Sequence, residues 1–362
     1  MPKSSDTAVD RRVFLKQAVA GAAALSAPAI ISPFGGVIGT ASAEESKKIV
    51  VGTWGGDYAN LLHKNVETPF LEPKGWEVVQ DTASDAPRRA KMVAEKRLPR
   101  GTSDVQALSD VNVAEMVAAG VLEKLDYSKL SQGANVLPVL KSDYAVPHIY
   151  SGLVLVYNPK LFPTPPASLN DLFDAKNAGK VGVIDIQYIY TIMAAAIVGG
   201  GSLTNFEPAK AKLNDLKKQG VKIYPTNEGM AQALKTEEVG LCIMWKARCV
   251  QWQKAGVPVE SVAPKEGILA YQSLFSIPKN APNKQGGYAY LDAILQSQAQ
   301  IAFANDMGYN PTVTDAPIAD DLRKRIGFTD DEQKRLIAPD LGYVVQNDAK
   351  WKEWWDKEFK AA

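Results

Sequence analysis

Aromatic and polar side chains recur at the points where predicted strands of this sequence end. They follow buried strands that end near residues 53 and 108 in the first half of the chain, and near 185 and 245 in the second. Open α/β sheets bind ligands at the carboxyl ends of their strands, so these side chains are candidates for one ligand site. For each residue alone, surface packing or helix capping is the alternative. The candidates are Trp54, Asp57, Tyr58, Ser109, Asp110, Gln187, Tyr188, Trp245, Lys246 and Arg248.

The residue patterns expected of an enzyme do not occur in the sequence. His63 and His148, the two histidines, are far apart, and neither has a partner at metal-ligand spacing. The glycine patterns that bind phosphate or a dinucleotide are missing, and so is the Gly-x-Ser-x-Gly turn that carries a serine nucleophile. We therefore expect a binding protein without catalytic activity, cofactor or metal.

Composition and charge describe an ordinary globular protein. Hydrophobic residues make up 46% of the chain and charged residues 22%, which excludes a disordered chain. The 41 basic residues are balanced by 40 acidic ones, for a net charge of +1, so the basic surplus of a nucleic-acid-binding protein is absent. The two cysteines, Cys242 and Cys249, could form a disulfide or remain free buried thiols, and either role would be structural.

Residues 1–43 are typical of a bacterial export signal. Arg11 and Arg12 precede an apolar stretch over residues 18–38, and a small-residue cleavage sequence follows at 41–43. This order predicts a twin-arginine signal that is removed on export, which would place the mature protein in the periplasm. A single membrane anchor is the alternative, but prolines and glycines interrupt the apolar stretch.

Strands and helices alternate along the rest of the chain, which favours an α/β fold with a mostly parallel sheet in each of two lobes. We expect the first lobe to comprise residues 44–149 and about 272–318, and the second residues 150–271 and about 319–362. Aromatic residues on one face of the last helix, 351–359, predict that this helix docks onto a core. The main predicted strands are 47–53, 77–80, 104–108, 152–157, 180–185 and 239–245, and the main predicted helices are 58–71, 87–97, 113–119, 190–198, 209–220 and 286–305.

Six short motifs stand in a fixed order along the chain, at 54–58, 157–159, 240–245, 262–267, 276–284 and 307–311. Together they give the chain a resemblance to the periplasmic solute-binding proteins of ABC importers, within the spermidine/putrescine-type branch. The resemblance implies a type II binding-protein fold, in which hinge strands join two α/β lobes and the ligand lies in the cleft between them. It also implies a small-molecule ligand and an inner-membrane permease as partners, and we expect a monomer.

The resemblance implies a cleft lined by aromatic side chains. In the family these rings enclose the carbon chain of the ligand, and their faces can contact a cation. A serine adds a polar contact. The corresponding residues here are Trp54, Tyr58, Trp245 and Tyr271, with Ser109 as the serine.

Some of the carboxylates that bind amines in polyamine-binding members are missing. Ser273, itself a candidate polar contact, stands where an acid is expected two residues after Tyr271. The acids expected just after Asp185 are replaced by Ile186, Gln187 and Ile189. A long polyamine would therefore leave ammonium groups unpaired in this cleft. The acids that remain in the first lobe are Asp57, Asp85 and Asp110.

The ligand predicted from these residues is a small solute with an anionic group, either an amino acid-like zwitterion, an organic carboxylate or a phosphonate. Arg248, with help from Lys246, would bind the anion, while Asp57 or Asp110 would bind any amine. Alternate residues of a helix do not share a face, so at most one of the two cations should point into the cleft. Both could instead face solvent.

Three other functions remain as alternatives. Polyamine binding is the first of them. A ferric-iron carrier would need tyrosines that converge on the metal, and the close pairs are Tyr188 with Tyr190 and Tyr288 with Tyr290. A secreted enzyme would need a nucleophile and a base, which the sequence does not indicate.

Overall fold

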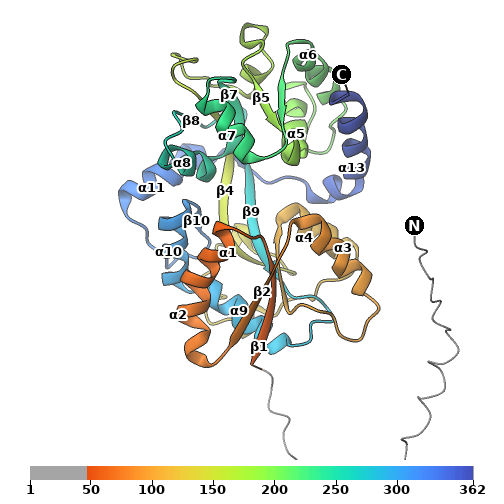
Figure 1. Cartoon of the computed structure of the whole chain (residues 1–362), viewed down its shortest axis with the longest axis vertical. Helices are drawn as coiled ribbons and strands as arrows, with labels where there is room; N and C mark the ends of the chain where they lie inside the picture. Colours follow the sequence, from red (N-terminus) through yellow and green to blue (C-terminus); the bar gives the residue numbers. More distant parts are fainter. Residues whose placement is uncertain (1–46, 362) are drawn as a thin grey trace, which may run out of the picture. The chain divides into compact units, whose positions relative to one another are not determined.

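The computed structural model of the protein describes residues 47–361, so the predicted export signal lies outside the described residues. The described part of the chain folds into two lobes of helices packed around strands, drawn as the lower and the upper half of the ribbon in Figure 1. Within this range, no helix combines the length and the apolar character needed to cross a membrane.

Three parallel strands form the centre of the first lobe. β1 (Lys48–Thr53) lies between β2 (Glu77–Thr82) and β3 (Val105–Ser109). Each strand leads into a helix, namely α1 (Asp57–Leu62), α3 (Asp85–Glu95) and α4 (Asp110–Ala118). The carboxyl ends of these strands and the amino ends of these helices therefore meet at one edge of the sheet. The helix predicted over 58–71 is divided into α1, a π-helical turn (His63–Glu67) and α2 (Thr68–Phe70).

The second lobe repeats this plan with different residues. β5 (Gly182–Ile184) pairs in parallel with β6 (Lys222–Tyr224), while β7 (Leu241–Trp245) and β8 (Glu260–Val262) pair with a longer strand described below. α5 (Tyr188–Val198) follows β5 after the short turn Asp185–Gln187, α7 (Asn227–Lys235) follows β6, and α8 (Lys246–Lys254) follows β7. α6 (Ala209–Lys218) packs against α5.

Two long antiparallel strands connect the lobes. β4 (Val146–Tyr157) pairs with β9 (Ile268–Ser276) over its first half and with β7 over its second half. β9 in turn pairs with β3 of the first lobe, and Figure 1 shows β4 and β9 side by side between the two lobes. The mostly parallel sheets expected from the sequence are thus mixed, because the connecting strands run antiparallel to their neighbours. Two short strands pair with these connecting strands: β10 (Asn310–Pro311) lies antiparallel to β4, and β11 (Leu336–Ile337) lies parallel to β9.

The remaining helices complete the two lobes. The single helix predicted over 286–305 is two helices, α9 (Lys284–Ile294) and α10 (Ser297–Met307), because the chain turns at Leu295 and Gln296. α11 (Asp320–Ile326), α12 (Asp330–Gln333) and α13 (Leu341–Trp354) follow, and α13 continues as a π-helical turn, Trp355–Phe359. Trp351 and Trp355 are fully buried, so the aromatic face of the last helix packs into a core, as the sequence predicted.

Two hydrophobic cores account for most of the buried side chains. One contains residues from 49–149 and 275–316, together with Ala247, and the other contains residues from 153–269 and 328–359. The exact lobe boundaries stay a prediction. Cys242 and Cys249 are both buried in the second lobe and are not bonded to each other. Burial raises the pKa of both thiols, which keeps them protonated and unreactive at neutral pH.

Candidate functional site

Three helices of the first lobe begin with an aspartate at the edge where the strands end. These residues are Asp57 of α1, Asp85 of α3 and Asp110 of α4. An acid in the first turn stabilises a helix through the positive end of its dipole, so each has a structural role. They differ in surroundings, because Asp57 is exposed, Asp85 is half-buried and Asp110 is only 6% exposed.

Asp110 is a buried carboxylate that lies between the two lobes. Its Oδ1 accepts hydrogen bonds from the backbone N–H of Val111, at 2.8 Å, and from the hydroxyl of Tyr190 in the second lobe, at 3.3 Å. Among the described residues, no lysine or arginine forms an ion pair with it. Burial raises its pKa from the ordinary 3.8 to about 6, although these hydrogen bonds oppose the rise. The carboxylate is therefore ionised at neutral pH but lacks a positive partner.

A cluster of aromatic rings stands beside Asp110. Trp245, at the end of β7, stacks on Tyr271 of β9 with ring centres 4.6 Å apart, and the ring of Tyr190 meets Trp245 edge-on at the same distance. Tyr309 lies 6.3 Å from Tyr271. Burial, and after it the neighbouring side chains of Tyr309, Asp85, Tyr58 and Asp110, disfavour ionisation of Tyr271, so its pKa is well above its usual value. We call Tyr190, Trp245, Tyr271 and Tyr309 the aromatic cluster.

Trp54 and Tyr58 form a second aromatic pair on the first lobe, with ring centres 5.1 Å apart. The Tyr58 hydroxyl is hydrogen-bonded to Nδ1 of His148, at 2.8 Å, and to Oγ of Ser273, at 3.1 Å. His148 is fully buried, and burial lowers its pKa to about 3, so it is neutral. Ser273, which stands where an acid was expected, therefore holds the Tyr58 side chain in place.

Arg88 is a buried cation that sequence reasoning missed. Its guanidinium donates to the carbonyls of Ala83 and Ala107 at 3.0 and 2.6 Å, and to the Oδ1 of Asp85 at 2.9 Å. It also lies 5.1 Å from the centre of the Trp54 ring. Arg88 thus forms an ion pair with Asp85 and a cation–π contact with the Trp54 ring. No sequence signal marks it, because a single arginine inside an amphipathic helix usually faces solvent.

The structure separates the two cations predicted at the start of α8. The ammonium group of Lys246 donates to the carbonyl of Gly327 and lies 5.0 Å from the centre of the Phe328 ring. Both of its partners therefore belong to the second lobe. Arg248 has no hydrogen-bond or ion-pair partner among the described residues, and its Nε atom is buried. Its charge opposes the rise that burial causes in the pKa of Tyr309, which places it close to the aromatic cluster.

The other predicted residues have partners that define their roles. Ser109 caps α4 by accepting a hydrogen bond from the backbone of Asn112 at 3.3 Å. Gln187 donates to Asn227 at 2.7 Å, and its own carbonyl oxygen is buried without a partner. Tyr188 donates to Asp348 of α13 and packs against Trp355. Tyr188 is therefore held by the C-terminal helix and is not part of the aromatic cluster.

The two tyrosine pairs considered for iron have separate partners. Tyr188 and Tyr190 donate to Asp348 and Asp110, which lie in different lobes. Tyr290 donates to the buried Glu67 at 3.0 Å, whereas the hydroxyl of Tyr288 accepts from the backbone of Asp126 at 2.9 Å. Within residues 47–361, no group of three metal-ligating side chains stands together.

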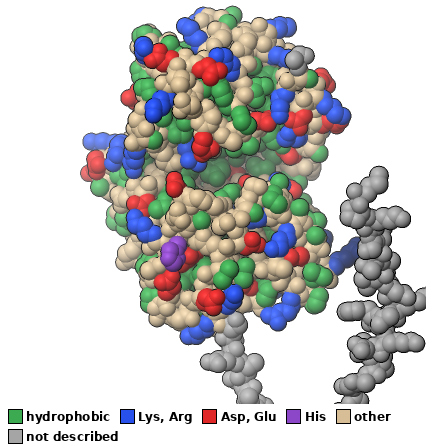
Figure 2. Space-filling view, in the orientation of Figure 1, with side chains coloured by type: hydrophobic (Ala, Val, Ile, Leu, Met, Phe, Trp, Pro, Cys, Tyr) green, Lys and Arg blue, Asp and Glu red, His purple; other side chains and the backbone are tan. Residues whose placement is uncertain are grey.

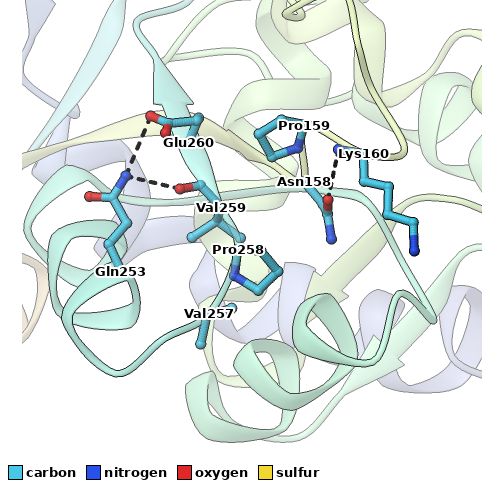
Figure 3. Close-up of a pocket in the computed structure, with 8 residues that line it drawn as sticks. All are labelled: Asn158, Pro159, Lys160, Gln253, Val257, Pro258, Val259 and Glu260. Carbon is cyan, nitrogen blue, oxygen red and sulfur yellow. Dashed lines mark hydrogen bonds between the residues drawn. The ribbon is translucent and has the colours of Figure 1, made fainter.

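The surface is hollowed between the two lobes, and Figure 2 shows hydrophobic side chains inside this cleft. A separate pocket of about 470 Å³ lies in the second lobe, where β4 ends and β8 begins, and Figure 3 shows the residues that line it. Asn158 and Lys160, just after the end of β4, line one side, and Gln253 and Glu260 line the other, with Gln253 donating to Glu260 at 3.4 Å. This pocket contains none of the predicted ligand residues, so the cleft remains the candidate site.

Comparisons with known proteins agree with this architecture. Residues 68–330 match the family model described as bacterial extracellular solute-binding protein. The spermidine/putrescine-binding periplasmic protein of Escherichia coli (strain K12) is 27% identical over 251 residues, which are 66% of this chain and 71% of the relative.

Two solved structures share the fold. The structure of the Atu4243-GABA receptor has a TM-score of 0.75 at 23% identity, and the alignment covers 87% of this chain and 98% of the receptor chain. The binding protein MotA from A. tumefaciens B6, in complex with glucopine, has a TM-score of 0.73 at 21% identity and covers 85% of this chain and 98% of its own. The chain belongs to the bacterial extracellular solute-binding protein family, whose members serve as solute-binding components of ABC transporters.

Proposed function

We propose that this protein captures a small solute with a cationic amine in the cleft between its lobes and delivers it to an ABC permease. The observation that carries the proposal is Asp110, a carboxylate buried between the lobes without a positive partner in the described part of the chain. A buried charge is costly unless an opposite charge pairs with it. An ammonium group of the ligand would supply that charge when the lobes close around it.

The aromatic residues support the same ligand chemistry. Trp245 and Tyr271 stack on each other beside Asp110, and Trp54 stands on the first lobe. Such rings cover the carbon chain of a small solute and stabilise a nearby cation through their faces. Of the ligand classes predicted from the sequence, a zwitterion fits Asp110, whereas a carboxylate or phosphonate without an amine would leave it unpaired.

Polyamine binding is the second candidate, favoured by the three aspartates that open α1, α3 and α4. The curated relatives named as spermidine/putrescine-binding proteins give it further support. Against it, Asp85 is already paired with Arg88, and Ser273 is hydrogen-bonded to Tyr58. Of these three aspartates, Asp57 and Asp110 are left, which would match the two ammonium groups of putrescine but not the three of spermidine.

Several predictions from the sequence belong to the same proposal. We infer that the protein acts in the periplasm after export by the twin-arginine route, that it works as a monomer, and that it neither catalyses a reaction nor binds nucleic acid. The family relationship supports the periplasmic location, because the Escherichia coli relative named above is a periplasmic protein. Size-exclusion chromatography with light scattering would test the monomer.

A ligand screen tests the function. Purified protein is heated with polyamines, amino acids, carboxylates and phosphonates, because a ligand that binds the folded state raises the unfolding temperature by mass action. We expect stabilisation only by compounds with an amine, and loss of that effect in Asp110→Asn. Stabilisation by simple carboxylates alone would contradict the proposal, and so would amine binding that is unchanged in Asp110→Asn.

A further inference from the structure

The first turn of α8 carries positive charge at a place where negative charge is expected. Lys246 and Arg248 are its first and third residues, and the turn contains no acid. The residue before the helix, Trp245, provides no side-chain cap. Because the amino end of a helix is the positive end of its dipole, two cations there destabilise the helix unless an anion is nearby.

Arg248 has the properties of an unfilled anion ligand. Lys246 already donates to the carbonyl of Gly327, whereas Arg248 has no partner among residues 47–361 and its Nε is buried. A guanidinium binds a carboxylate through two parallel, charge-assisted hydrogen bonds, which would include this Nε. The first turn of this nine-residue helix therefore combines the positive end of the dipole with a partly buried guanidinium that has no partner among the described residues, and the two together offer an anion site.

This site lies on the same aromatic cluster as Asp110. Arg248 follows Trp245 by three residues and acts on the phenol of Tyr309, which lies 6.3 Å from the ring of Tyr271. Trp245 stacks on Tyr271 and meets the ring of Tyr190 edge-on, and the Tyr190 hydroxyl donates to Asp110 at 3.3 Å. Within residues 47–361, the first lobe thus has a carboxylate without an ion-pair partner and the second lobe a guanidinium without one, and both adjoin the aromatic cluster.

We propose that Arg248, at the positive end of α8, binds the carboxylate of the ligand, so that the ligand is a zwitterion whose amine pairs with Asp110 of the opposite lobe. The amine half of this inference rests on the proposed function, and the carboxylate half does not. A zwitterion neutralises both unpaired charges, whereas a diamine would bring a second cation towards Arg248. A dicarboxylate would bring a second anion towards Asp110.

Isothermal titration of the mature chain with matched ligands tests this inference. The ligands are straight-chain diamines, ω-amino acids and dicarboxylates of two to six carbons, together with a set of α-amino acids. We expect an amino acid to bind most tightly, and Arg248→Gln to weaken it at least about thirtyfold, as when one partner of a buried charge pair is removed. Arg248→Gln should leave the affinity for the diamine of equal length unchanged or increase it.

The controls separate the two halves of the ligand. Lys254→Gln removes the same charge from the far end of α8, where Lys254 is exposed and donates to the carbonyl of Asn305, and it should change no affinity. Arg248→Lys should restore part of the binding because it restores the charge. The inference is overturned if no amino acid binds, if a diamine binds more tightly than every amino acid, or if Arg248→Gln weakens both equally. Asp110→Asn reports independently on the amine half, so a failure of the proposed function would be visible separately.

Discussion

The two lobes build their cleft surfaces from the same elements but give them opposite charge. In the first lobe, α1, α3 and α4 each begin with an aspartate. In the second lobe, α5 begins with no acid in its first turn and no side-chain cap, and α8 begins with Lys246 and Arg248. The first lobe thus matches these helix dipoles with acids, whereas the second lobe leaves those of α5 and α8 uncompensated and provides a cap, Thr226, and an acid, Glu228, only at the start of α7.

This difference shows that the residues in the first turn of a helix can give each lobe its own charge at the cleft without changing the fold. If the proposed zwitterion is the ligand, we expect it to bind in one direction, with its cation on the first lobe and its anion on the second. The hydrogen bond from Tyr190 to Asp110 joins the lobes at this boundary. The predictions below test each side of this comparison.

Removing the acid of the first lobe should have the largest effect. Asp110→Asn keeps the shape and can still accept from Tyr190 and Val111, but it deletes the charge that pairs with the amine. We expect affinity to fall by at least about thirtyfold, as for the loss of one partner in a buried pair. Titration calorimetry measures the loss. Asp215→Asn, at an exposed position of α6 where Asp215 forms an ion pair with Lys218, is the control and should bind normally.

The same substitution should stabilise the protein in the absence of ligand. Asp110 has a raised pKa, so protonation favours the folded state, and this stabilisation is complete below pH 3.8 and lost as the pH rises through about 6. At neutral pH the ionised carboxylate therefore costs up to about 3 kcal/mol, which asparagine avoids. Urea unfolding at pH 7.5 should show the gain. A variant less stable than the natural protein would show that Asp110 is not strained by burial.

Removing the buried cation of the first lobe tests whether Asp85 is truly neutralised. Arg88→Met removes the guanidinium that donates to the carbonyls of Ala83 and Ala107 and leaves Asp85 without its ion pair, so we expect a loss of about 3 kcal/mol in unfolding free energy. The neighbouring Arg89→Met, which breaks a half-exposed pair with Glu115, should cost about 1 kcal/mol or less. Equal losses for the two variants would mean that Arg88 has no special role.

The pH dependence of ligand binding sharpens the comparison further. Because Asp110 must be ionised to pair with an ammonium group, affinity should fall up to about tenfold for each pH unit below 6, where this carboxyl becomes protonated. Calorimetry between pH 4.5 and 8 measures this slope. Any binding that remains in Asp110→Asn should lack the slope in this window. If the affinity of the natural protein does not change down to pH 4.5, Asp110 does not pair with the ligand.

Lys246 should show the smallest effect. Its ammonium is used by the carbonyl of Gly327 and the ring of Phe328, so Lys246→Met should change ligand affinity less than about threefold, which is below 1 kcal/mol. This result would assign the positive charge of the second lobe to Arg248. A loss as large as that of Arg248→Gln would instead show that both residues serve the ligand.

Much of the framework followed from the sequence, because alternating apolar strands and helices are local patterns. The strand predicted over 47–53 is β1, and the strand predicted over 239–245 contains β7. Helix starts were less accurate. α4 begins at Asp110 and not at Val113, because Ser109 caps it through its side chain.

The site depended on contacts that have no local signal. Tyr188 and Tyr190 are two residues apart, yet they point to different lobes, because alternate residues of a helix face different directions. Arg88 and His148 are buried through partners far along the chain, so their roles could not be derived from spacing. The loss of an acid at Ser273 was visible in the sequence, but its hydrogen bond to Tyr58 was not.

The pairing of β4 with β9 has a thermodynamic consequence. A hinge made of two hydrogen-bonded strands can bend while every bond in the ladder stays intact, so closing the cleft need not melt or form secondary structure. The heat-capacity change on binding should then come almost entirely from the apolar surface that the ligand and the closing lobes remove from water. Measured over a range of temperatures, it would give the area of the cleft that closes.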